Sequence, residues 1–293
     1  MNPDGGQIVA LGVDVGGTKI AVGGIRADGS DLPLGQEPTL RGDGHGNAET
    51  VRKLLRSARE SAMVPVGLSV TTTVDHEGRL RDAAGWLGWS GWTAADIVGT
   101  DSPALAANDA MCGAVAEQRV GAGQGAASML YVTLGTGLAH AFVVGGSVWS
   151  GAHNAALFSG WSPAGAAPGA STWEELCAGP ALARRFDGGA DARPLAAAVR
   201  RADPFALRVL DEGADALAAY LALLVQTMDP DVVVVGGGLA SGFPEYVRGA
   251  IERCPTLYRQ QLFADTPFTT AALGNASCWM GAALIAQDDS RLR

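Results

Sequence analysis

Residues 8–26 read IVALGVDVGGTKIAVGGIR, and this stretch decides how the whole chain is interpreted. Two apolar runs, 8–15 and 19–26, flank the short segment Gly16-Gly17-Thr18. Apolar runs of this length with glycines between them predict two strands joined by a tight turn. Glycines let the backbone approach an anion closely, and Thr18 and Lys19 add a hydroxyl and a positive charge. The segment therefore predicts a phosphate-binding turn, although a simple hairpin would have the same pattern.

Outward from this stretch, strand-like and helix-like patterns follow one another along the chain. Strands are expected at 64–70, 129–134, 138–144 and 232–235, and helices at 47–61, 110–118, 211–228 and 278–285. A strand that runs into a glycine-rich turn recurs at Gly16, Gly135 and Gly236. The pattern predicts an α/β architecture with three open loops.

Three further motifs lie in these loops. TLGTG at 133–137 is again a strand end followed by hydroxyl and glycine residues. VVVVGGGL at 232–239 either lines an adenosine pocket or links a strand tightly to a helix. In Asn108-Asp109-Ala110, an acid stands where a strand gives way to a helix, so Asp109 either accepts a proton from a hydroxyl or caps the helix. Asp14 lies near the end of the first strand. Its carboxylate oxygens are hard ligands of the kind that Mg²⁺ prefers, and they could hold the ion through water.

Composition limits the partners. The 293 residues are 47% hydrophobic and 17% charged, which suits a packed core. A net charge of -9 argues against nucleic acid or an anionic membrane as the main partner. The N-terminus has no leader-like pattern, and no apolar run is long enough to span a membrane. Four scattered cysteines suit a reducing cytoplasm, so we expect a cytoplasmic protein with small-molecule ligands.

In this order and spacing, the four motifs resemble those of the ROK family of sugar kinases and sugar-responsive repressors, over about residues 8–285. D-x-G-G-T-K, N-D-A, T-L-G-T-G and the late G-G-G match that family's phosphate, catalytic, phosphate and adenosine motifs. The resemblance implies an α/β, two-lobed actin/hexokinase-like (ribonuclease H-like) fold with an interlobe cleft. It implies a small lobe of residues 1–108 and 276–293, a large lobe of residues 109–275, and a homodimer.

The resemblance also implies an ATP-dependent kinase that uses Mg²⁺, in which a sugar hydroxyl attacks the γ-phosphorus and Asp109 accepts its proton. The residues implied to bind ATP and its phosphates are Asp14, Gly16, Gly17, Thr18, Lys19, Thr133, Gly135, Thr136, Gly137, Gly236, Gly237 and Gly238. The residues implied to contact the acceptor are Asn108, Asp109 and Glu174, together with Gly85, Phe158 and Trp161 at positions where this chain departs from the family.

The departures concern the acceptor and a zinc site. The family segment G-x-x-G-x-A-G-E-x-G-H, laid on residues 151–161, places its sugar-binding Glu at Phe158 and its zinc-ligating His at Trp161. The cysteine-rich stretch that follows keeps only Glu174, with Thr172 in place of its last cysteine. Without thiolates or the histidine, no zinc is expected. Residues 84–86, Ala-Gly-Trp, replace the family's P-N-L, so another polar contact is lost.

The replacements predict an acceptor site lined by Trp86, Trp89, Phe158 and Trp161, although Phe158 and Trp161 would also fit as core residues that fill the lost zinc site. Each sugar hydroxyl left without a partner costs about 1–3 kcal/mol. Glucose is therefore expected to be a poor substrate. An amino sugar such as kanosamine, or a C7-cyclitol, fits better, and kinases that resemble this family act on both in actinobacterial natural-product pathways, which suggests antibiotic biosynthesis.

Other functions compete with this interpretation. A ROK repressor would carry an N-terminal DNA-binding domain, whereas seven residues precede Ile8, so a repressor is not expected. A catalytically inactive sugar-binding protein is a second alternative, which the retained phosphate motifs argue against. An ordinary glucokinase is a third.

Overall fold

The computed structural model describes residues 6–58, 63–82, 84–99 and 103–288, which form two compact units. Unit 1 comprises the described residues within 1–121, 143–156 and 275–293, and unit 2 comprises residues 122–142 and 157–274. This division differs from the lobes expected at residue 108, because the helix that starts at Asp109 packs within unit 1. Among the described residues, no helix combines the length and apolar character that crossing a bilayer requires.

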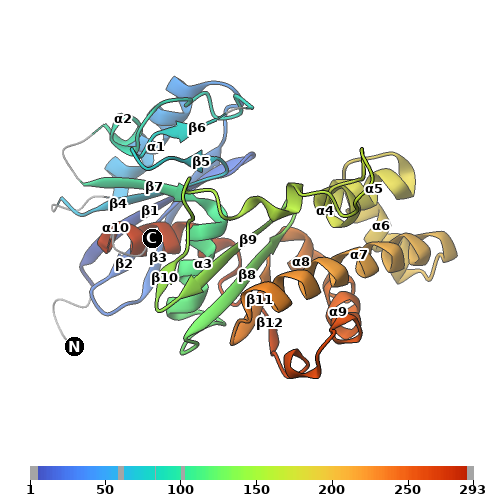
Figure 1. The fold of residues 1–293 in the computed structure, drawn as a ribbon. Coiled ribbons are helices and arrows are strands. Elements are labelled where there is room, and N and C mark those ends of the chain that lie inside the picture. The colour runs from blue at the N-terminus through green and yellow to red at the C-terminus, as the bar shows by residue number, and fades with distance from the viewer. Residues whose placement is uncertain (1–5, 59–62, 83, 100–102, 289–293) are drawn as a thin grey trace. The chain divides into compact units, whose positions relative to one another are not determined.

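Unit 1 is built on a five-stranded sheet in the order β3-β2-β1-β4-β7 (Figure 1). Its strands are β1 (Ile8–Val15), β2 (Lys19–Arg26), β3 (Asp31–Pro38), β4 (Val66–Val70) and β7 (Ala104–Asn108). β1 pairs antiparallel with β2 but parallel with β4, which pairs parallel with β7. In this register Val15 lies opposite Val70, and Val70 opposite Asn108. The parallel strands therefore end at one edge, the usual place for a ligand site in α/β sheets.

Helices cover both faces of this sheet. The helix α10 (Ser277–Gln287) lies directly on β1 and β4, since a Cβ on Gly12 or Gly67 would overlap its backbone. On the opposite face, α1 (Gly44–Ala58) contacts β2 and β3, and its buried apolar stripe shares one core cluster with alternate residues of β1. The helix α3 (Asp109–Val120) packs on α10 so closely that only a glycine fits at Gly281. The remaining elements of unit 1 are β5 (Thr73–Val74), β6 (Leu80–Arg81), α2 (Ala94–Val98) and β10 (Ser147–Val148).

The second sheet has the order β10-β9-β8-β11-β12. Its other strands are β8 (Ser128–Leu134), β9 (Leu138–Val144), β11 (Val232–Gly236) and β12 (Phe268–Thr270). β10 pairs with Val143 and Val144, the end of β9 that belongs to unit 1. Counted along the chain within each sheet, both have the strand order third, second, first, fourth, fifth. Gly16 and Gly135 each follow the first strand of their sheet, which explains why the two turns have similar sequences.

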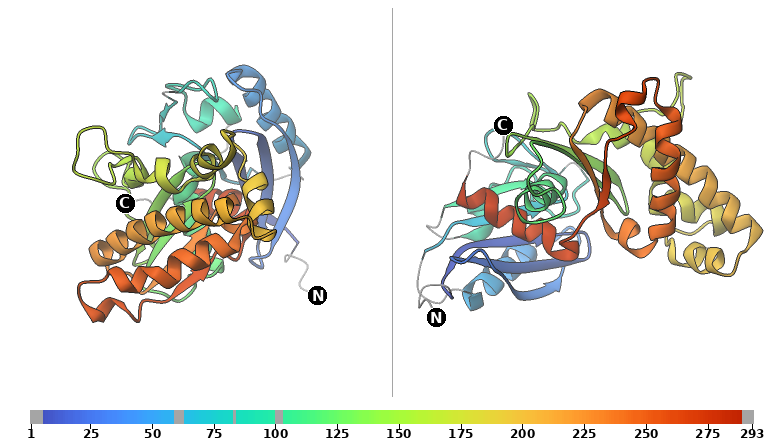
Figure 2. Two further views of the ribbon diagram at one scale, coloured as in Figure 1. Left: turned by 90° about the vertical axis from the view of Figure 1, so that its right-hand side faces the viewer. Right: turned by 90° about the horizontal axis from the view of Figure 1, so that it is seen from below.

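Unit 2 is rich in helices. They are α4 (Trp173–Cys177), α5 (Gly179–Asp187), α6 (Arg193–Arg200), α7 (Pro204–Met228), α8 (Gly238–Gly242) and α9 (Pro244–Arg253). A short 3-10 turn, η1 (Phe158–Trp161), precedes these helices, and three more follow them, namely η2 (Cys254–Leu257), η3 (Gln261–Phe263) and η4 (Gly274–Ala276), the last of which extends into unit 1. The long α7 and α9 run side by side (Figure 2), and their apolar faces share one core with β8 and β11.

The predicted elements are present with shifted ends. The bounds expected for β1, β2 and β9 are confirmed. The helix expected at 47–61 begins earlier, at Gly44, where the Asp43 carboxylate accepts the Gly46 amide, and its last expected residues lie outside the described ones. The helix expected at 211–228 begins at Pro204, because Asp203 accepts two amides of its first turn.

Candidate active site

Two carboxyl groups stand at the carboxyl edge of the unit 1 sheet. Asp14, near the end of β1, accepts a hydrogen bond of 3.0 Å from the Ser69 hydroxyl of β4. Burial raises the pKa of Asp14 to about 6. Burial, and then the charge of Asp14, raise the pKa of Asp109 to about 7. Two carboxyls that disfavour each other's charge fit a nearby divalent cation, and a pKa near neutrality suits a general base.

The hydrogen bonds at the start of α3 show whether Asp109 is needed as a helix cap or is available as a proton acceptor. Asn108 is the residue that caps the helix, since its side-chain oxygen accepts the Ala110 amide at 2.9 Å. Asp109 is the first helical residue and also accepts the Ala110 amide, at 2.9 Å. The helix therefore has its cap without Asp109. Asn108 is 4% exposed and donates to the Thr72 carbonyl at 3.2 Å, which leaves one amide N–H for a ligand.

The turn Gly16-Gly17-Thr18 is braced from behind by Thr39. The Thr39 hydroxyl donates to the Gly16 carbonyl at 2.8 Å, and its backbone amide donates to the Thr18 carbonyl at 3.1 Å. Within the described part of the chain, the exposed Gly17 and Thr18 have no recorded acceptor for their amides. Free amides on a fixed turn are what an anion site requires. Lys19 is half-buried, and its charge lowers the pKa of Asp14 against the larger effect of burial.

In unit 2, the second motif adjoins Glu174. The Gly135 amide donates to the Gly137 carbonyl at 2.9 Å, which closes the turn after β8. The Glu174 carboxylate accepts the Leu138 amide at 2.9 Å and lies so near Gly137 that a Cβ there would be 2.8 Å from its oxygen. Thr133, at the penultimate position of β8, pairs with Gly236 of β11. The predicted Thr133–Gly137 turn and Glu174 are therefore neighbours, although 37 positions separate Gly137 from Glu174 in the sequence.

The third glycine motif packs against the second. A side chain on Gly237, whose φ is +97°, would overlap the backbone of Leu134, so only glycine lets β11 pass this close to the end of β8. A Cβ on Gly135 would lie 3.7 Å from the Gly238 amide nitrogen. Between these loops lies a pocket of about 360 Å³. It is lined by Gly135, Thr136, Gly179, Pro180, Ala190, Asp191, Ala192, Arg193, Ala196, Gly238, Leu239, Gly242 and Phe243.

Several of these lining residues were not predicted. Asp191 binds the Arg193 guanidinium at 2.6 Å on the pocket wall, in the segment between α5 and α6. Leu239 and Phe243 line it from α8 and the residue that follows it. The segment GGADAR at 188–193 has neither a periodic pattern nor a motif, so only the fold brings it to the glycine loops.

Phe158 and Trp161 form a stacked pair in η1. Their ring centroids are 4.3 Å apart and the planes differ by 12°. Trp161 is 58% exposed and Phe158 is half-buried, so the alternative that the pair belongs to the core is wrong. The turn is held by a network that was not predicted. The Ser159 hydroxyl lies 2.8 Å from His140 Nδ1 and 2.8 Å from the Tyr220 hydroxyl.

Of the two tryptophans in the loop 85–89, Trp89 lies in the core and Trp86 at the surface. Trp89 is fully buried and donates its indole N–H to the Gly44 carbonyl at 2.7 Å, so the expectation that it lines an acceptor site is wrong. Trp86 is 43% exposed, and its ring lies beside Gly17. Gly85 has a φ of +65° with open space around its Cβ position. The Asp82 carboxylate accepts the amides of residues 86–88 and fixes the loop.

Within the residues that the structure describes, no group of three or more His, Cys, Asp and Glu side chains has the arrangement of a metal site. The absence of zinc stays a prediction from the sequence. The pair of Asp14 and Asp109 fits an ion bound through water, for which fewer direct protein ligands suffice.

A family model, curated relatives and solved structures show which proteins this chain resembles. The model of the ROK family matches residues 10–289. A kanosamine kinase from Amycolatopsis mediterranei (strain S699) is 30% identical, over 94% of this chain and 95% of that protein. A ROK hexokinase from Thermus thermophilus is 32% identical, with a TM-score of 0.80 over 96% of this chain and 98% of that one. A ROK glucokinase from Streptomyces griseus, solved with glucose and AMPPNP, is 26% identical with a TM-score of 0.78 over 95% and 99%.

These likenesses confirm the α/β, actin/hexokinase-like fold that the motifs implied. The family match extends from β1 to the end of the described chain and includes all four motifs. On this evidence the chain belongs to the ROK family.

Proposed function

We propose that this ROK sugar kinase transfers the γ-phosphoryl group of ATP to the primary hydroxyl of a hexose-like acceptor other than glucose, such as the amino sugar kanosamine or a C7-cyclitol. The observation that carries the proposal is the exposed Phe158–Trp161 stack in η1. It stands where the sequence resemblance predicts a sugar-binding Glu and a His. Aromatic rings there cannot replace the hydrogen bonds of a carboxylate and an imidazole.

In the proposed reaction, the acceptor oxygen forms a bond to the γ-phosphorus while the bond to the β–γ bridging oxygen breaks and ADP leaves. Asp109 accepts the hydroxyl proton, for which its pKa of about 7 suits it. The Gly17 and Thr18 amides and the Thr136 hydroxyl are proposed to donate to phosphate oxygens. Bound Mg²⁺ would neutralise part of the phosphate charge, and Asp14, fixed by Ser69, would hold it through water.

The nucleoside is proposed to occupy the pocket of about 360 Å³ in unit 2. Its walls at Leu239 and Phe243 are apolar, as a planar base requires, and its glycine loops bring backbone amides close to the phosphate chain. Glu174, whose carboxylate is already fixed by the Leu138 amide, is proposed to accept a hydrogen bond from an acceptor hydroxyl.

The acceptor class follows from what the stack can bind. A sugar hydroxyl that loses its partner costs about 1–3 kcal/mol, which disfavours glucose. A protonated amino group over an aromatic face gains about 0.5–2 kcal/mol, which favours an amino sugar. The likeness to a kanosamine kinase at 30% identity supports this class. The homodimer and the natural-product pathway implied by the resemblance remain part of the proposal.

A panel of acceptors tests the proposal. The protein is incubated with MgATP and one acceptor, which is kanosamine, a C7-cyclitol, N-acetylmannosamine or glucose. The rate is measured as ADP release, and ³¹P NMR identifies the phosphorylated product. We expect kcat/KM for kanosamine or the cyclitol to exceed that for glucose by about tenfold or more. Glucose as the best acceptor would identify an ordinary glucokinase. ATP and sugar binding without turnover of any acceptor would identify an inactive sugar-binding protein.

A further inference from the structure

Three loops of unit 1 are fastened to one another around the phosphate turn. Thr39 binds two carbonyls of the turn 16–18, as described above. The Gly42 amide donates to the Trp86 carbonyl at 2.8 Å, and Trp89 donates to the Gly44 carbonyl at 2.7 Å. Residues 39–44 therefore join the phosphate turn to the loop 85–89. The backbone of these three segments therefore forms one braced group beside the turn.

Arg41 and Trp86 occupy the exposed side of this group. The guanidinium carbon of Arg41 lies 4.7 Å from the centroid of the Trp86 ring. The edge of the same ring meets the phosphate turn, since a Cβ on Gly17 would lie 3.8 Å from Trp86 Cζ3. The indole thus lies between the neighbourhood of Gly17 and the guanidinium of Arg41. A cation held on an aromatic face keeps its N–H donors, which lie in the guanidinium plane, free for a ligand.

The charges around the turn distinguish Arg41 from other arginines. Within the described part of the chain Arg41 has no carboxylate partner, whereas Arg81 pairs with Asp75 and Arg253 with Asp211. Lys19, the other cation at this turn, lies close enough to Asp14 for its charge to act on that carboxyl. In the proposed reaction, the phosphates of a nucleoside triphosphate would approach the carboxyl groups of Asp14 and Asp109. A free guanidinium beside the turn offsets that repulsion.

We infer that Arg41, oriented by Trp86, is a further catalytic residue, whose guanidinium donates hydrogen bonds to the terminal phosphate of the donor. The inference rests on the proposed phosphoryl transfer and adds no bond to it. Arg41 keeps its proton throughout, while the acceptor proton goes to Asp109 and ADP leaves with the bridging oxygen. Trp86 is a positioning residue, because it acts through the guanidinium.

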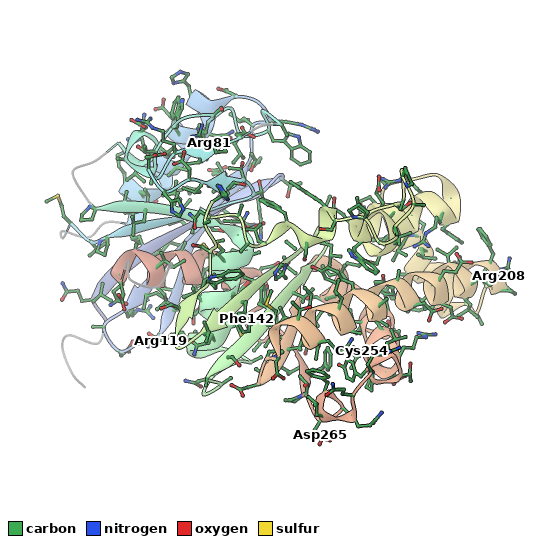
Figure 3. All side chains as sticks on the ribbon, viewed as in Figure 1. Arg81, Arg119, Phe142, Arg208, Cys254 and Asp265 are labelled. Atoms are coloured by element: carbon green, nitrogen blue, oxygen red, sulfur yellow. The ribbon has the colours of Figure 1, made fainter. Side chains whose placement is uncertain are left out.

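Arg41→Ala tests the inference, with Arg208→Ala as the matched control. Arg208 also lies over an aromatic ring, 5.4 Å from the centroid of Phe205, but on α7 of unit 2 (Figure 3). In calorimetry without acceptor, Arg41→Ala should weaken MgAMPPNP about tenfold and MgADP less than about twofold, because only the triphosphate has the contacted group. With an acceptor, kcat/KM for MgATP should fall about 100-fold. Arg208→Ala should change neither quantity.

Conservative variants separate the charge from packing. Arg41→Lys should recover part of the MgAMPPNP affinity, and Trp86→Leu should reduce it more than Trp86→Phe, which keeps an aromatic face. The melting temperature of each variant shows that it is folded. Equal binding of MgAMPPNP by Arg41→Ala and the parent would overturn the inference, and so would a variant that raises KM for the acceptor alone. Because the binding experiment needs no acceptor, an error in the proposed acceptor does not affect it.

Discussion

Asp109 is the residue on which the proposed chemistry depends. Asn108 caps α3, so replacement of Asp109 removes a proton acceptor without removing the cap. Asp109→Asn should lower kcat by about 10²–10⁴-fold, the usual contribution of a general base. Steady-state kinetics measures the loss, and an unchanged melting temperature shows that the fold is intact.

The pH dependence gives Asp109 a second signature. Because its pKa is raised to about 7, the carboxyl is protonated below that pH and cannot accept the hydroxyl proton. In the parent, kcat/KM for the acceptor should rise with pH up to about 7. This rising, acidic limb of the pH profile should be absent in Asp109→Asn. A variant that keeps both the limb and a rate within a few-fold of the parent would show that Asp109 is not the base.

Single residues show where sequence reasoning succeeds and fails. Asp109 and Glu174 were identified by motif, and the structure places Asp109 at the start of α3 and Glu174 beside Gly137. Trp89 was expected in the acceptor site but is buried in the core, because spacing alone does not tell which of two neighbouring tryptophans faces inward. Arg41 belongs to no motif. It lies over the Trp86 ring, whose edge is beside Gly17, only because segments far apart in the sequence meet there.

At the scale of elements, the turn η1 depends on a buried histidine. His140 of β9 lies 2.8 Å from the Ser159 hydroxyl, and burial lowers the pKa of His140 to about 4. The unfolded chain takes up a proton at His140 near pH 6.5, whereas the folded chain stays neutral there. Stability from this residue is therefore full above about 6.5 and is lost as the pH falls toward 4.

Urea unfolding at pH 7.5 and pH 5 measures this effect. Between these values the parent should lose roughly 2 kcal/mol more of its unfolding free energy than His140→Gln, which does not titrate. His153→Gln, at an exposed position in the turn between β10 and η1, is the control and should behave as the parent does. If His140→Gln loses as much stability as the parent on acidification, His140 is not the group responsible.

The elements themselves were largely predictable, because the strands are apolar runs ended by glycine. The ends of β1 and β2 were predicted for this reason. The strand β3 was not, since DLPLGQEP contains two prolines and a glycine and has an exposed, alternating pattern, features that fit only the edge of a sheet. The starts of α1 and α7 were missed, because their caps, Asp43 and Asp203, lie several residues before the expected starts at 47 and 211.

At the scale of the whole molecule, the motifs are divided between the two units. Asp14, the phosphate turn and Asp109 belong to unit 1, whereas Thr136, Glu174 and Gly238 belong to unit 2. The order of the motifs predicted the family, since four spaced patterns are far more specific than any one of them. The path of the chain was not predictable in the same way. Residues 276–293 were expected to join the N-terminal lobe, but the return of residues 143–156 to unit 1 was not expected. In that unit α10 meets α3 through the contact between Gly281 and Cys112.

The central claim, that the Phe158–Trp161 stack makes this ROK kinase prefer an acceptor other than glucose, is tested most directly by Phe158→Glu combined with Trp161→His. Both positions are at least partly exposed, so the double variant should fold. The measurement is the ratio of kcat/KM for glucose to kcat/KM for the best acceptor of the parent. The ratio should rise by about tenfold or more, because a carboxylate and an imidazole can pair with ring hydroxyls that aromatic faces leave without partners. A folded double variant with the parent's ratio would contradict the claim.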